Sequence, residues 1–195
     1  MNKTTKQFML SDNYIFKIYG AYEWYNKTKP DNNIENKTEK NKVEITKNKK
    51  SLKAIKQIIS QISNNSLIKK DSVKIRYNRL RATAGSFLIE GIRDRISNCN
   101  VIIFDITGFN PNVMFELGIA LEAAHYKSNA AKIYLICEGE KFDCSKVPSD
   151  LSGYFISFYE IKKDKVVFHD SNSLTMRLIS DIADVTYQAY IEPEE

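Results

Sequence analysis

Short apolar runs alternate with amphipathic stretches along this chain. The runs are too short for helices and predict strands at 14–19 (YIFKIY), 72–78, 101–104 (VIIF), 132–137 (KIYLIC) and 154–161, with a hairpin arm at 166–169. Apolar residues at helical spacing predict helices from Ser51 to about Asn64, at 87–98, from Pro111 to about Tyr126, and after a capping Ser173. The elements therefore follow the order β, α, β, α, β, α, β, β, α.

This order is typical of a mostly parallel sheet with helices on both faces, because parallel neighbours need crossover helices. We expect a flavodoxin-like, three-layer α/β fold with a five-stranded sheet in the order 2-1-3-4-5, formed by residues 1–195 as one domain. Residues 26–50 are polar and of low complexity, and we interpret them as a loop compatible with disorder.

The stretch NVIIFDITGFNPNVMFELGIALEAA, residues 100–124, carries the strongest local signals. Val101–Phe104 reads as a strand buried on both faces, and it stops at Asp105. Gly108 marks a turn, Asn110 stands where an N-cap belongs, and Pro111 occupies the first helical position, where its missing N–H costs nothing. The pattern predicts a strand–loop–helix unit with polar residues at the carboxyl end of the strand.

Glu116 is the unusual residue of that helix. It lies at the margin of the predicted buried stripe, and its neighbours three and four positions away include no cation. A carboxylate among apolar residues needs a distant cation, a donor or a ligand. The spacing fits both a structural ion pair and a functional carboxylate. The predicted stripe itself consists of Val113, Leu117, Ala120 and Ala124.

A flavodoxin-like order places the topological switch point between the first and third strands. The predicted crevice there is lined by residues 20–22 on one side and 105–116 on the other. Arg76, Arg79 and Arg81 come near the end of the second strand and could bind a phosphate or pair with a carboxylate. The aromatic rings of Tyr22 and Trp24 could wall a pocket or cover the sheet edge.

Residues 105–120, DITGFNPNVMFELGIA, resemble the signature of the bacterial TIR-like and nucleoside 2-deoxyribosyltransferase-like superfamily, and residues 147–159 resemble a later segment of the same group. In that superfamily a glutamate early in this helix attacks or stabilises the anomeric carbon of a ribosyl group. The resemblance implies that Glu116 and Asp105 are catalytic. The candidate substrate-binding residues are Tyr19, Gly20, Tyr22, Arg81, Thr107, Asn110 and Asn112. For both asparagines, plain helix capping is the alternative.

The activity that the resemblance implies is cleavage of an N-glycosidic bond, with NAD+ as substrate rather than cofactor and nicotinamide as product. It also implies a role in antiviral defence, a homo-oligomer and a downstream effector protein. One alternative is a deoxyribosyltransferase or hydrolase acting on a nucleoside or nucleoside monophosphate. Another is a module that senses a nucleotide without turnover.

Composition and charge narrow the kinds of partner and the location that remain for this protein. Of the net charge of +5, much comes from residues 27–56, with ten lysines against four acidic residues; this stretch is rich in Asn and contains no arginine. We therefore interpret it as a solvated loop and not as a nucleic-acid site. Three cysteines and two histidines lack metal-ligand spacing, and no run has transmembrane length. We expect a cytoplasmic protein without a metal centre or a membrane partner.

Overall fold

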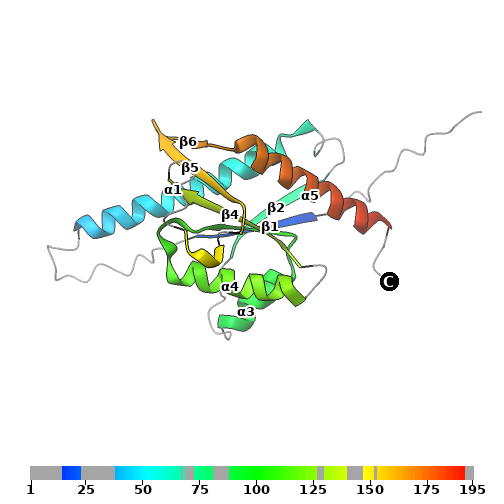
Figure 1. Cartoon of the computed structure of the whole chain (residues 1–195). Coiled ribbons are helices and arrows are strands. Elements are labelled where there is room, and N and C mark those ends of the chain that lie inside the picture. Colours follow the sequence, from blue (N-terminus) through cyan, green and yellow to red (C-terminus); the bar gives the residue numbers. More distant parts are fainter. Residues whose placement is uncertain are drawn as a thin grey trace, which may run out of the picture.

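The computed structural model describes residues 15–22, 38–66, 68, 73–80, 88–126, 130–139, 147–151 and 153–191, with the backbone alone at 38–48, 88, 171–172 and 188–191. Figure 1 shows three layers, with a central sheet between two pairs of helices. The fold is α/β with a mostly parallel sheet, as the alternation of elements predicts.

The sheet has six strands in the order β2-β1-β3-β4-β5-β6. They are β1 (Ile15–Ala21), β2 (Lys74–Arg79), β3 (Val101–Asp105), β4 (Lys132–Glu138), β5 (Ile156–Lys162) and β6 (Lys165–Phe168). The pairs from β2 to β5 are parallel, whereas β6 is antiparallel to β5. The predicted order 2-1-3-4-5 is confirmed. The predicted count of five was wrong because the hairpin arm adds a sixth strand through a turn at Lys163 and Asp164, which both have positive φ.

In the part of the chain that the structure describes, two helices cover each face of the sheet. The helices are α1 (Thr38–Ser63), α3 (Leu88–Ser97), α4 (Pro111–Tyr126) and α5 (Ser171–Ile191). Figure 1 shows α1 and α5 above the sheet and α3 and α4 below it, and each pair closes its own apolar core. In the part of the chain described here, no helix combines the length and apolar character that crossing a membrane requires.

Two predicted boundaries were wrong. Helix α1 begins at Thr38, so the second half of the predicted 26–50 loop is helical, and residues 23–37 lie outside the described part. Lysine and glutamate favour helix without producing an apolar stripe, which is why periodicity did not reveal this extension. Helix α5 begins at Ser171, so Ser173 lies inside it and is not its cap.

Gly20 is the position in β1 where the packing leaves no room for a side chain on the α1 side of the sheet. A Cβ there would lie 2.7 Å from Tyr77 Oη, 3.0 Å from Tyr77 Cε2 and 3.1 Å from Ile55 Cδ1. The Tyr77 ring from β2 therefore fills the space that a side chain at position 20 would need. Gly20 serves the packing of β1 against β2 and α1.

We expect Gly20→Ala to destabilise the fold by about 1–3 kcal/mol, because overpacked cores respond on this scale. The loss should be smaller in a Tyr77→Phe background, which removes the hydroxyl from the closest contact. Urea unfolding of the two single variants and the double variant would measure this coupling.

Gly118 offers a matched control, because it lies exposed in α4 and a Cβ there meets nothing within 4 Å. Gly118→Ala should leave stability unchanged or raise it by up to about 1 kcal/mol, as expected of a helical glycine. A destabilisation by Gly20→Ala no larger than the effect of Gly118→Ala would contradict the packing role.

Candidate functional site

The connection from β3 to α4 is built by local hydrogen bonds. Gly108 (φ 71°) and Phe109 (φ 49°) turn the chain in the left-handed region. The Oδ1 atom of Asn110 then accepts hydrogen bonds from the backbone N–H of Asn112 at 3.0 Å and of Val113 at 3.4 Å. Asn110 is thus an N-cap, as predicted, and α4 begins at Pro111.

Asp105 is buried, with 3% of its surface exposed, and its carboxylate is surrounded by donors. Its Oδ1 accepts hydrogen bonds from the backbone N–H (3.0 Å) and the hydroxyl of Thr107. Its Oδ2 accepts one from the hydroxyl of Tyr159 on β5 at 2.6 Å, and Ser51 of α1 contributes another. Burial raises the pKa of Asp105, and these hydrogen bonds oppose that rise.

Thr107 extends this network to β4. Its Oγ1 accepts a hydrogen bond from the backbone N–H of Glu138 at 2.7 Å. The carboxylate of Glu138 forms an ion pair with Lys50 of α1, with 2.5 Å between Oε1 and Nζ. Asp105 and Thr107 therefore tie three strands and α1 together. We interpret both as positioning residues and not as groups that touch a substrate.

Glu116 lies half-buried in α4, on the opposite side of the sheet from the Asp105 carboxylate. Burial raises its pKa to about 7, and the charge of Arg79 partly offsets this rise. Glu116 thus has the distant cation that its local sequence lacks. Of the predicted stripe, Val113, Leu117 and Ala120 are buried, but Ala124 is exposed because α4 extends past the core there.

Arg79 links the carboxyl end of β2 to the residue that follows β1. Its guanidinium carbon lies 4.6 Å from the centre of the Tyr22 ring, and Nη2 donates to the carbonyl oxygen of Tyr22 at 3.4 Å. A cation over an aromatic face is attracted by the ring quadrupole. Arg79 therefore holds the residue that follows β1 and also acts electrostatically on Glu116.

The structure brings part of the predicted site together. Tyr22, Glu116 and the Asn110 cap belong to elements that meet at the carboxyl edge around β1 and β3. Asn112 is exposed in the first turn of α4, and Tyr19 packs half-buried against the core on the α4 side. Gly20 is covered by Tyr77. Arg81 and Trp24 lie outside the described residues.

Two important residues were missed by the sequence reasoning. Tyr159 looked like one more apolar residue of a buried strand, and Ser51 looked like a helix start. The feature of the sequence that could have revealed them is the hydroxyl group that each carries. A buried hydroxyl needs a hydrogen-bond partner, and Asp105 is that partner here. Arg79 was one of three candidate cations, and only the fold distinguishes it from exposed Arg76.

Glu116 supplies the site with an acid–base group. With a pKa of about 7, its ionised and protonated forms coexist near neutral pH. The ionised form can stabilise a developing positive charge or act as a nucleophile. Within the described residues, no group of three or more His, Cys, Asp or Glu side chains is arranged to hold a metal ion.

Comparison with known proteins assigns no family. No protein-family model matches the chain, and no curated protein matches it.

We expect Tyr159→Phe to destabilise the protein by about 1–3 kcal/mol, because it leaves the buried Asp105 carboxylate without one of its donors. Urea unfolding at neutral pH would measure the change. Tyr187→Phe is the matched control, because this ring is 66% exposed on α5, and it should have no measurable effect. Equal stability of the two variants would show that the Asp105 network does not hold the carboxyl edge.

Proposed function

We propose that this protein cleaves the N-glycosidic bond of a nucleotide, with NAD+ as the leading substrate. The observation that carries the proposal is the half-buried Glu116, whose pKa is raised to about 7, in the helix that follows β3. Ligands of open α/β sheets bind at the carboxyl edge near the switch point, which is where this helix begins. The resemblance of residues 105–120 to the TIR-like and nucleoside 2-deoxyribosyltransferase-like superfamily supports the same reaction.

We place NAD+ before an ordinary nucleoside as the proposed substrate because of its leaving group. The nicotinamide nitrogen of NAD+ carries a positive charge, so nicotinamide departs as a neutral base with the electrons of the broken bond. A neutral purine or pyrimidine must instead be protonated as it leaves, which calls for an acid as well as a carboxylate. Asp105, the other carboxylate predicted for the site, is engaged in internal hydrogen bonds.

In the proposed reaction, ionised Glu116 faces the anomeric carbon and stabilises the oxocarbenium-like transition state or forms an ester with it. Water then attacks the same carbon, and where an ester has formed its bond to Glu116 breaks and the carboxylate is restored; the products are ADP-ribose and one proton. Tyr22, which follows β1 and is contacted by Arg79, is the aromatic residue that we propose to lie beside the base. Asn112, exposed in the first turn of α4, is available to bind ribose hydroxyls.

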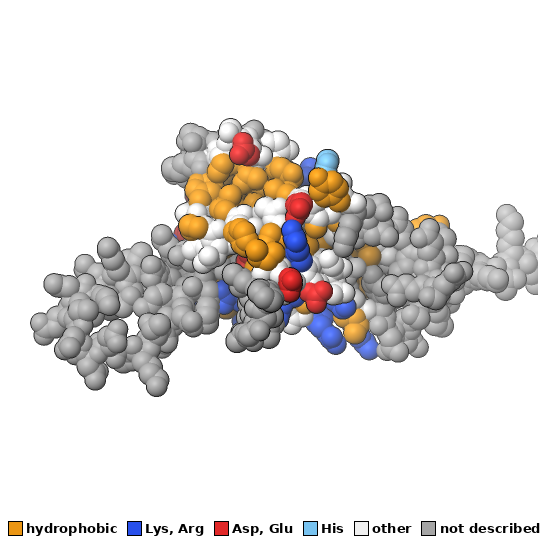
Figure 2. Space-filling model, turned by 90° about the horizontal axis from the view of Figure 1, so that it is seen from below, with side chains coloured by type: hydrophobic (Ala, Val, Ile, Leu, Met, Phe, Trp, Pro, Cys, Tyr) orange, Lys and Arg blue, Asp and Glu red, His pale blue; other side chains and the backbone are white. Residues whose placement is uncertain are grey.

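The remaining properties are also proposals. A role in antiviral defence with an effector protein is what the resemblance implies, and we propose a cytoplasmic location from the cysteine usage. Self-association is supported by hydrophobic side chains gathered on the outer face of α3 and α4, which Figure 2 shows. Ile89 is 44% and Phe115 is 47% exposed there, and Phe115 adjoins Glu116 in the chain. The patch gives a second copy an apolar surface beside the site.

The direct test is incubation of the purified protein with NAD+ at low and high protein concentration, with products separated by chromatography. Wild-type protein should release nicotinamide. Glu116→Gln should lower the rate by at least about 100-fold, because it removes the ionisable group from a site of nearly the same shape.

Glu122→Gln is the matched control on the same helix, because the Glu122 side chain is 53% exposed and pairs with Arg93. It should keep the wild-type rate. Release of a free base from nucleosides or nucleoside monophosphates, without NAD+ loss, would indicate the deoxyribosyltransferase-like reaction. Stoichiometric nucleotide binding without turnover would indicate the sensing module.

The pH dependence tests the role of Glu116 separately. Since the ionised form is the active one and its pKa is raised to about 7, the rate should rise with pH through neutrality. Between pH 6 and pH 8 the ionised fraction, and with it the rate, should increase about tenfold. A rate that is flat over this range would show that another group carries the chemistry.

A further inference from the structure

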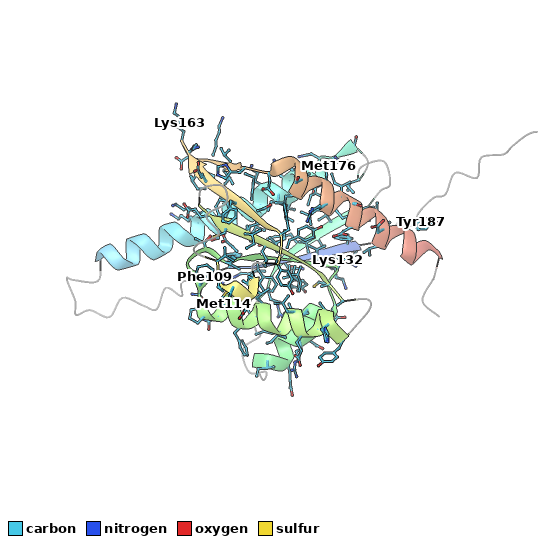
Figure 3. The ribbon with its side chains drawn as sticks, in the orientation of Figure 1. Phe109, Met114, Lys132, Lys163, Met176 and Tyr187 are labelled. Carbon is cyan, nitrogen blue, oxygen red and sulfur yellow. The ribbon has the colours of Figure 1, made fainter. Side chains whose placement is uncertain are left out.

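Two adjoining hollows open at the amino end of β4, on the edge of the sheet opposite the candidate site. One lies towards α4 and the other towards α5, with volumes of about 420 Å³ and 440 Å³. They share Lys132, Ile133 and Tyr154 in their linings. Figure 3 shows Lys132 far from Phe109 and Met114, which mark the carboxyl edge.

The register of the sheet explains the opening. Pairing of β4 with β5 begins at Leu135 opposite Ile156, whereas β4 itself begins at Lys132 and pairs with β3 from its first residue. In the described part of the chain, residues 132–134 thus have no strand partner on the β5 side. The segment 153–155 leads into β5 and lines the α5-side hollow together with α5.

The α5-side hollow has aromatic walls and two cations. Tyr154 is 45% and Phe155 is 38% exposed, and the guanidinium carbon of Arg177 lies 4.0 Å from the centre of the Phe155 ring. Lys132 is exposed and lines both hollows. Among the residues that the structure describes, neither Arg177 nor Lys132 has a carboxylate within ion-pair distance.

Asp181 is the acidic residue of this lining, and its carboxylate is engaged elsewhere. It lies one helical turn after Arg177, yet its Oδ2 accepts a hydrogen bond from the hydroxyl of Tyr134 at 2.5 Å. This contact joins β4 to α5 within the lining of the hollow. The lining therefore presents two positive charges and one negative charge, beside exposed rings.

We infer that the α5-side hollow is a second binding site, for a planar aromatic anion of about mononucleotide size. The ring of such a ligand would stack on Tyr154, since every base offers a π-face to an aromatic side chain. Its anionic group would lie between Lys132 and Arg177, where the Phe155 ring already orients the guanidinium. The volume falls within the range of roughly 300–1,000 Å³ that is typical of small-molecule sites.

This inference does not depend on the proposed function, because none of the lining residues belongs to the carboxyl edge. A nucleotide bound in this hollow would lie at the opposite edge of the sheet from Glu116. Binding here would be regulatory and not catalytic.

The test is NMR titration of the full-length 15N-labelled protein with adenosine 5′-monophosphate, and with adenosine and ribose 5-phosphate as its two halves. Adenosine 5′-monophosphate should shift the amide signals of residues 132–134 and 153–155 in a saturable way. Each half should bind at least about tenfold more weakly, because stacking and charge contribute separately.

Tyr154→Leu should weaken binding of adenosine 5′-monophosphate about tenfold and Lys132→Gln about threefold or more. Tyr187→Leu and Lys165→Gln are matched controls on exposed positions away from the hollow and should not change it. Well-dispersed spectra of each variant would establish that it is folded.

Three results would overturn the inference. The first is no saturable shift at residues 132–134 and 153–155 up to about 10 mM ligand. The second is binding of adenosine as tight as that of the monophosphate, which would remove the role of the cations. The third is an unchanged dissociation constant in Tyr154→Leu. Shifts confined to Tyr22 and residues 107–116 would also overturn the inference, because they would place the nucleotide at the candidate site instead.

Discussion

The hydrogen-bonded carboxylate of Asp105 is the contact on which the carboxyl edge of the sheet depends. A buried carboxylate is costly unless donors surround it, so every element that supplies a donor is held in place. Here the donors come from the turn after β3, from Tyr159 on β5 and from Ser51 on α1. Through Thr107 the same network reaches the end of β4. The turn that leads into α4 is fixed as a result.

The position of Glu116 follows from that turn. Asn110 caps α4 directly after it, and Glu116 lies in the second turn of the helix. Because parallel strands end at one edge, Tyr22 after β1 and Arg79 at the end of β2 come from separate parts of the chain to the same region. The two carboxylates thus differ in role. Asp105 is surrounded by donors, whereas among the described residues the charge that opposes the raised pKa of Glu116 is that of Arg79.

The local elements could be predicted because each depends on residues close in sequence. The strand before Asp105, the Asn110 cap and the order of the first five strands follow from apolar runs and helix-start signals. Contacts between residues that are far apart in the sequence could not be predicted in this way. Whether Asp105 faces α1 or α4 depends on which helix covers which face, and Tyr159 meets it 54 residues further along the chain. The first half of α1 was missed because its polar residues form helix without an apolar stripe.

Glu116 is a desolvated carboxylate under the influence of Arg79. The most direct test is a 13C NMR titration of the glutamate side-chain carboxyl groups, with the Glu116 signal assigned through its loss in Glu116→Gln. We expect a midpoint near pH 7 in the wild type and a higher one in Arg79→Gln, because the cation that favours ionisation is gone. A midpoint near the ordinary value of 4.5, unchanged in Arg79→Gln, would contradict this expectation.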